Sequence, residues 1–197
     1  MRISALRLAA AATLLLAACR TTQVPLPPSA PWDQRRPQLQ AWEHFELRGR
    51  VAVATADSGF NANLLWAQDG ARSALTLEGP LGAGAVKIDS SGRDLDIVNA
   101  NGEHLDSDTA RAELRSRLGF EPPFGSLRYW VLGVPDPTQP AQESLDPAQQ
   151  RLSALTQSGW HIDYSAYTAV GAEALPQRLT LEREAVRLKL LVDHWQL

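Results

Sequence analysis

From Phe45 to the end of the chain, apolar and polar residues alternate in a series of short segments. A period of two places successive side chains on opposite faces of a β-strand, so each segment is predicted to be a strand with one buried face. The apolar positions are Phe45, Leu47, Gly49, Val51 and Val53; Phe60, Ala62, Leu64 and Trp66; Leu75 and Leu77; Val86 and Ile88; Leu95 and Ile97; Trp160, Ile162 and Tyr164; Leu179 and Leu181; and Val186, Leu188, Leu190 and Val192. With short strands at 102–105 and 151–157, about ten strands are predicted. Because most connections are short, neighbouring strands should be antiparallel.

The period changes in the middle of the chain, where two helices are predicted. Ser107 or Asp108 can cap the first helix, and Gly119 can end it. The second helix is short, begins near Ser126 and ends at Gly133. Their apolar sides are Ala110, Leu114 and Leu118 in the first, and Leu127, Trp130 and Val131 in the second. The segment after Gly133 contains three prolines and is predicted to be a loop.

These elements predict a mainly β (α+β) fold, an antiparallel barrel or strongly bent sheet. Many antiparallel strands in one domain curl because their twist accumulates and because open edges invite aggregation. A barrel of this size can enclose a cavity, and the helical insert is well placed in the sequence to cover an open end. The interior could therefore hold a ligand.

The N-terminus has the pattern of an export signal. A segment with two arginines precedes an apolar run at 8–18, which is too short to span a bilayer. The run ends in Leu-Ala-Ala-Cys, which resembles the lipobox of bacterial lipoproteins, in which Cys19 would receive a diacylglycerol and become the mature N-terminus. The alternative is an ordinary secretory signal with an incidental cysteine. In lipoproteins of enteric bacteria, an Asp after the lipidated Cys retains the protein in the inner membrane; Arg20 stands here, which implies the outer membrane.

The next segment, 20–40, contains five prolines and few core-forming residues. It is predicted to be a semi-rigid linker of polyproline character, and about twenty residues at ~3.1 Å each could lift the domain up to roughly 60 Å from its anchor. The expected organisation is thus a signal peptide at 1–18, a lipidated Cys and Pro-rich tether at 19–41, and a single domain at 42–197.

Composition and charge exclude some partners. The 197 residues suit one globular domain, and the formal net charge is -3. Removal of the signal would leave 17 basic and 22 acidic residues, because Arg2 and Arg7 lie within it. This excess of acidic residues argues against nucleic-acid binding, which depends on clustered Lys and Arg. The sequence also lacks a polybasic patch that would bind anionic lipid. The one cysteine rules out an intramolecular disulfide.

The sequence carries no motif for catalysis or metal binding. The four histidines lack metal-ligand spacing, and no Gly-x-Ser-x-Gly or phosphate-loop pattern is present. His161 and Asp163 would share the polar face of one strand, as alternating polar residues do on any half-exposed strand. We therefore expect no enzyme activity, no cofactor and no metal. The conspicuous residues are the six tryptophans and the leucine-rich strand faces, which suit a core or a cavity wall.

The connection "EGPLGAGAV" at 78–86 carries a leucine where a polar residue would be usual. Proline and glycine explain the turn, but Leu81 must either fold inward or face an apolar partner outside.

Several motifs together resemble the LolB family of outer-membrane lipoproteins. They are the lipobox at Cys19, "FELRGRVAV" at 45–53, "LLWAQ" at 64–68, "EGPLG" at 78–82, "LRYWVLGVP" at 127–135, "GWHIDY" at 159–164, "LP" at 175–176 and "RLKLLVDHWQL" at 187–197. The proline-rich linker and the segment 136–150 diverge. The resemblance implies an unclosed antiparallel barrel of about ten or eleven strands, with a helical lid and an apolar cavity.

The resemblance also implies a function. A LolB-like protein accepts lipoproteins from the periplasmic carrier LolA, holds their acyl chains in the cavity and places them in the outer membrane without a nucleotide. The protein would be lipid-anchored in the outer membrane, face the periplasm and act as a monomer, and its contacts with LolA should be electrostatic.

Particular residues follow from the same resemblance. Gly79, Pro80, Leu81 and Gly82 match the loop whose leucine puts lipoproteins into the bilayer. Four tryptophans match recurring tryptophans of the family: Trp66, Trp130, Trp160 and Trp195. They are expected to line the cavity or the lid, and the alternative that they only pack the core stays open. The alternative function is a lipid-anchored periplasmic scaffold with a filled barrel and no ligand. A hydrolase comes third and would need a nucleophile and base in hydrogen-bonding distance.

Overall fold

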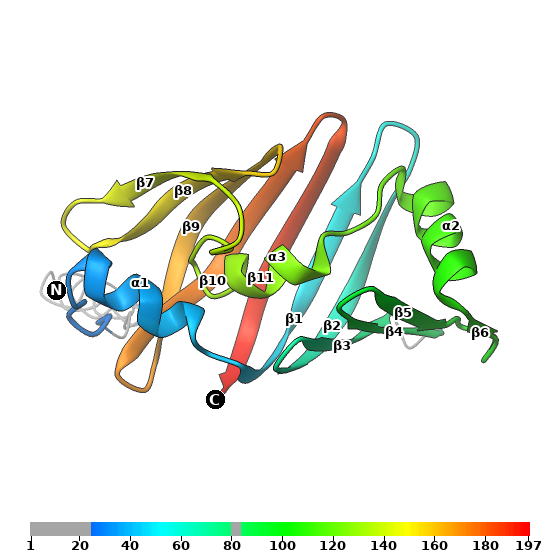
Figure 1. Ribbon diagram of the computed structural model, residues 1–197, viewed down its shortest axis with the longest axis horizontal. Helices are drawn as coiled ribbons and strands as arrows, with labels where there is room; N and C mark the ends of the chain where they lie inside the picture. Colours follow the sequence, from blue (N-terminus) through cyan, green and yellow to red (C-terminus); the bar gives the residue numbers. More distant parts are fainter. Residues whose placement is uncertain (1–24, 80–83) are drawn as a thin grey trace, which may run out of the picture.

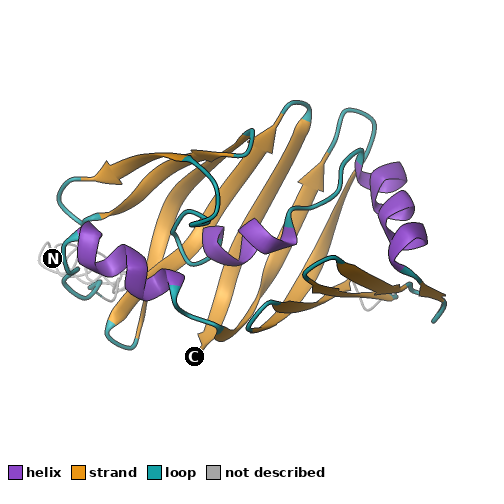
Figure 2. Cartoon of the chain, viewed as in Figure 1, coloured by secondary structure: helices purple, strands orange, loops and turns teal. Residues whose placement is uncertain are grey.

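The computed structural model describes residues 25–79 and 84–197 as one curved antiparallel sheet with three helices (Figures 1 and 2). The elements in chain order are α1 (Trp32–Gln40), β1 (His44–Ala54), β2 (Gly59–Asp69), β3 (Arg72–Glu78), β4 (Ala85–Ser91), β5 (Asp94–Val98), β6 (His104–Leu105), α2 (Ser107–Leu118), α3 (Phe124–Trp130), β7 (Ala141–Asp146), β8 (Arg151–Gln157), β9 (Trp160–Val170), β10 (Glu173–Arg183) and β11 (Val186–Gln196).

The sheet consists of two meanders, β1 to β6 and β7 to β11, which lie side by side because the first strand, β1, pairs with the last strand, β11. Its order is β6-β5-β4-β3-β2-β1-β11-β10-β9-β8-β7, so β6 and β7 form the two edges and the barrel is not closed. Every neighbouring pair is antiparallel. The predicted fold class, an unclosed antiparallel barrel with helices, is confirmed.

Alternation along the strands sets which face is buried. In β1 the residues at positions 45, 47, 49, 51 and 53 are buried, and their neighbours face outward. Gly49 lies at a register shift against β11, where an added Cβ would lie 2.2 Å from the backbone oxygen of Leu191. Only glycine fits this close approach of two backbones, which allows the central strands to bend.

The helices lie along the concave face of the sheet (Figure 1). Over β7 to β10, the helices α1 and α3 complete a packed core, in which Trp130, Leu155, Ile162 and Leu175 are fully buried. The ring centroids of Trp130 and Trp160 are 6.3 Å apart. At the other end, α2 lies against β5 and β6.

A buried glutamine ties α3 and the following loop to the sheet. Gln157 is 2% exposed; its Oε1 accepts hydrogen bonds from Trp130 Nε1 at 2.7 Å and from the Asp136 backbone at 2.9 Å. Its Nε2 donates to the backbone oxygens of Asp136 and Gln139, each at 2.9 Å. The Gln157 amide thereby makes four hydrogen bonds, so its oxygen and its nitrogen are both fully satisfied.

Two parts of the sequence prediction are wrong. Residues 32–40 form α1 instead of a linker, and residues 141–146 form strand β7 instead of a loop. The helix α1 contains Pro37 and has little intrinsic support, but tertiary packing of its buried residues Arg35 and Leu39 holds it in place. Residues 25–79 and 84–197 therefore contain three helices.

The cap of α2 also differs from the prediction. Asp106, not Ser107 or Asp108, is the N-cap, and its side chain accepts a hydrogen bond from the Thr109 backbone at 3.0 Å. Gly119 ends the helix in the left-handed conformation, as predicted. Across residues 25–79 and 84–197, none of the helices has the length and apolar character needed to cross a membrane.

Candidate functional site

A cavity of about 470 Å³ lies between the concave face of the sheet and the helical segment 114–131. Its volume is typical of a site for a small organic ligand. The lining residues are Val51, Val53, Phe60, Asn61, Ala62, Leu64, Trp66, Leu75, Leu77, Gly79, Gly84, Val86, Ile88, Ala100, Leu114, Phe120, Pro122, Phe124, Leu127, Val131, Leu179, Leu181, Leu188 and Leu190. Among these described residues Asn61 is the one with a polar side chain, and none is charged. The cavity suits an uncharged, apolar ligand.

The sheet wall of the cavity follows directly from the alternation. Val51, Ala62 and Leu64 lie on the inward faces of β1 and β2, and Val51 pairs with Ala62 across the two strands. Trp66 closes this wall; it is 2% exposed, and its indole Nε1 donates to Gln68 Oε1 at 3.0 Å. The polar atom of the indole is thus satisfied away from the cavity.

The opposite wall comes from α2, α3 and the connection between them. Phe120 and Pro122 line the cavity from this connection, and Phe124 lines it from the start of α3. Proline has no backbone N–H, so a proline here presents one polar group fewer to the apolar space. Outside the wall, Arg111 Nε pairs with Glu121 Oε1 at 2.9 Å and holds the connection to α2. Sequence reasoning missed these lining residues, and the clustered aromatic residues and prolines were the available signal.

The rim of the cavity includes the stems of the connection between β3 and β4. Phe60 lines the cavity yet is 40% exposed, so the cavity reaches the surface beside it. The backbone N–H of Gly79 donates to the Gly84 oxygen at 3.3 Å. Gly84 has a φ of 73°, and an added Cβ would lie 2.8 Å from the Ala100 Cβ. A close contact between Gly84 and Ala100 therefore fixes one stem at the rim.

Several predicted site residues lie outside the described part of the chain. These are Cys19 and the loop residues Pro80, Leu81 and Gly82; Gly79 of the same motif is described and lines the cavity.

The four predicted tryptophans are not gathered at one site. Trp66 lines the cavity, whereas Trp130, Trp160 and Trp195 are buried in the core and are not among the cavity-lining residues. Trp195 packs edge-on against Phe45, with ring centroids 5.7 Å apart.

The polar pair that the sequence analysis considered for catalysis is solvent-exposed. His161 Nε2 and Asp163 Oδ1 are 3.4 Å apart on an exposed strand face, with both side chains about half exposed. Within residues 25–79 and 84–197, no three potential metal ligands come together. Burial raises the pKa of the Tyr164 and Tyr167 hydroxyls, and these groups donate to the backbone oxygens of Trp130 and Leu152. These tyrosines are structural donors in the core.

A family model and curated relatives both match this chain to the same family. The family model described as "Outer membrane lipoprotein LolB" matches residues 43–195. The outer-membrane lipoprotein LolB of Nitrosococcus oceani is 34% identical over 187 residues, which cover 93% of each chain. LolB of a Marinomonas species is 28% identical over 183 residues, again with 93% of each chain covered.

A solved structure supports the fold. The crystal structure of a LolA superfamily protein from Nitrosomonas europaea superposes with a TM-score of 0.52 at 12% identity, covering 86% of this chain and 94% of that chain. At this identity the likeness concerns the fold alone. By the family match and the curated relatives, this chain belongs to the LolB family of outer membrane lipoproteins.

Proposed function

We propose that this protein accepts acylated lipoproteins from a LolA-type periplasmic carrier and inserts them into the outer membrane. The observation that carries the proposal is the cavity, whose described lining is apolar apart from Asn61. Its volume is about 470 Å³, and it reaches the surface beside Phe60. An acyl chain needs this kind of site, because burial of each methylene group contributes about 0.8 kcal/mol and no polar partner is required.

The direction of transfer follows from a difference in affinity between carrier and receptor. Both proteins remove the same acyl chains from water, so the hydrophobic contribution largely cancels between them. A difference of about 1.4 kcal/mol in binding free energy shifts the equilibrium tenfold, so a modestly better fit in the receptor gives direction without a nucleotide.

Two attachments to the membrane complete the proposal. Lipidation of Cys19 holds the domain at the outer membrane on its periplasmic side, because two or three acyl chains give stable anchoring. Leu81, in the connection whose stems Gly79 and Gly84 line the cavity, enters the bilayer during delivery. Burial of one leucine contributes roughly 1.5 to 3 kcal/mol, which suits brief and reversible contact.

Uptake of a fluorescent fatty acyl probe by the domain tests the cavity. The proposal predicts saturable binding that excess unlabelled fatty acid competes away. Failure of the folded domain to bind the probe would favour the alternative, a lipid-anchored scaffold without ligand.

The substitution Leu81→Glu tests delivery separately. We expect folding and acyl-probe uptake to be retained while transfer of a model lipoprotein into liposomes is blocked, because a carboxylate does not enter the bilayer. The matched control is Leu65→Glu, which replaces a leucine that is 44% exposed on the outer face of β2. Delivery by Leu81→Glu at the rate of the control would rule out the insertion role of Leu81.

A further inference from the structure

The segment before the first strand is not a free tether, because residues 25–40, here called the strap, dock onto the folded domain. Arg35 is fully buried; its Nε pairs with Glu173 Oε2 at 2.8 Å and its Nη2 donates to the Ala174 backbone oxygen at 2.6 Å. Leu39 is 1% exposed and belongs to the hydrophobic core. Undocking the strap would break this pair and the hydrogen bond to Ala174 and would draw Leu39 out of the core, so the strap is firmly held.

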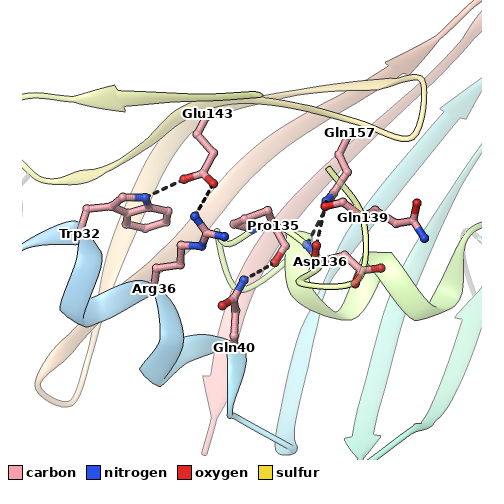
Figure 3. Close-up of polar contacts among 8 residues, drawn as sticks. All are labelled: Trp32, Arg36, Gln40, Pro135, Asp136, Gln139, Glu143 and Gln157. Atoms are coloured by element: carbon pink, nitrogen blue, oxygen red, sulfur yellow. Dashed lines mark hydrogen bonds and ion pairs between the residues drawn. The ribbon is translucent and has the colours of Figure 1, made fainter. Parts of the chain in front are cut away.

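A second set of contacts fastens the strap to the edge strand and the loop before it (Figure 3). Glu143 of β7 receives two donors, Trp32 Nε1 at 2.7 Å and Arg36 Nη1 at 2.9 Å. At the end of α1, Gln40 Nε2 donates to the Pro135 backbone oxygen at 2.8 Å.

The docked region extends upstream of α1. Arg151, which is 3% exposed, donates from Nη2 to the Pro27 backbone oxygen at 2.6 Å. Leu26 lines a hollow of about 570 Å³ formed with β8 and β9. The beginning of the strap and the turn between β7 and β8 thus lie at one and the same end of the long axis of the molecule (Figure 1).

The docked strap shortens the reach of the proposed lipid anchor. The held residue Pro27 is eight positions after Cys19, so the chain between them spans at most about 28 Å when fully extended. If the strap were free, the first fixed residue would be Trp42, which is 23 positions after Cys19, and the fully extended reach would be about 80 Å.

We infer that the anchored protein keeps the strap docked, so that the end of the domain formed by Leu26 and the turn 147–150 is the surface that faces the lipid bilayer. The inference rests on the lipid anchor of the proposed function. The turn reads Pro-Ala-Gln-Gln and carries no charge, and the carboxylate of the preceding Asp146 accepts hydrogen bonds from the Ala148 and Gln149 backbone, so the four turn residues present no charge of their own to lipid headgroups. The strands β4 and β5 and the helix α2 lie at the opposite end of the long axis (Figure 1). For the loop before β4 to deliver a lipoprotein, the anchored domain must therefore tilt from this resting orientation until its long axis lies along the membrane.

The experiment uses the full-length lipidated protein in vesicles that contain a headgroup-labelled acceptor lipid. A donor dye is attached at Ala148→Cys, in the exposed turn, where it reports proximity to the bilayer by energy transfer. The reference position is Ala185→Cys, in the turn between β10 and β11. We expect stronger transfer from position 148 than from position 185; equal transfer from the two would overturn the assignment of the membrane-facing end.

Two insertions then separate a docked strap from a free one. A flexible Gly-Ser insert of about twelve residues, with a span of roughly 20 Å, is placed either between Val24 and Pro25 or between Ala41 and Trp42. With a docked strap, transfer from position 148 falls with the first insert and is unchanged by the second. An equal fall with both inserts would mean that the strap is free, and no fall with either would mean that the tether does not set the distance. Vesicle flotation reports the lipid anchor itself, so failure of the anchor and failure of the docked strap give different results.

Discussion

The substitution Ala62→Phe tests whether the inward face of β2 borders usable empty space. Ala62 is 8% exposed, pairs with Val51 of β1 and lines the cavity. The larger side chain adds six ring carbons at this wall. If the cavity is empty, the ring enters it without displacing neighbouring side chains, whereas overpacking a filled core costs about 1 to 3 kcal/mol. The free energy of unfolding should therefore change little.

The cost to acyl binding can be worked from the volume. A cavity of about 470 Å³ holds on the order of fifteen groups the size of a water molecule, at about 30 Å³ each. Six added carbons remove more than a third of that room. If six methylenes of the ligand lose their place, binding weakens by up to about 5 kcal/mol, which is more than a thousandfold in Kd. Partial rearrangement of a flexible chain reduces this loss, and we expect at least about tenfold.

Titration of the fluorescent acyl probe gives the Kd, and chemical unfolding gives the stability. The matched control is Ala67→Phe, on the outward face of the same strand, which should leave the Kd unchanged. Wild-type affinity in Ala62→Phe would refute the placement of the acyl site. A loss of stability typical of an overpacked core, without a specific loss of binding, would refute the empty cavity.

Three further predictions concern the rim and the core. Gly84→Ala should destabilise the protein by about 1 to 3 kcal/mol more than Gly92→Ala, because both glycines have positive φ but only the first meets a neighbour, the Ala100 Cβ. Adding Ala100→Gly should remove the excess in chemical unfolding, and an unrelieved excess would contradict the contact. Gln157→Leu should lower the free energy of unfolding by at least about 2 kcal/mol, because it leaves the buried Trp130 indole N–H and the buried Asp136 backbone N–H without their acceptor; a loss below 1 kcal/mol would count against this role. Burial raises the pKa of Tyr164, so stability should fall as the pH rises above about 10, where only the unfolded state loses the proton. Circular dichroism and tyrosinate absorbance should show its ionisation together with unfolding, and ionisation in a folded protein would contradict this.

The strand pattern was readable from sequence because alternation reports directly which side chains point inward. The positions predicted for β1, from Phe45 to Val53, are the buried ones. The same pattern does not say whether an inward face meets a packed layer or empty space. Leu64 and Leu155 are both buried on strands, yet the first lines the cavity and the second lies in the packed core. That difference depends on where α1, α2 and α3 lie over the sheet, which is a tertiary property.

Two elements escaped prediction because their local signals point elsewhere. The helix α1 is preceded by Pro31 and contains Pro37, both of which favour a linker, and it is held by contacts of Arg35 with residues 138 or more positions away. Strand β7 reads Ala-Gln-Glu-Ser-Leu-Asp and follows a proline-rich loop, so it lacks a regular apolar face. Edge strands and docked segments draw their stability from distant partners, and sequence periodicity does not record those partners.

Transfer of cargo from carrier to receptor is the most direct test of the proposed function. The domain without its anchor is mixed with LolA from the same organism, loaded with an acylated lipoprotein, and the two proteins are separated. We expect most of the cargo to move to this protein without any nucleotide, and the Ala62→Phe variant to take up less of it. Cargo that stays on LolA in the presence of excess folded domain would contradict the account.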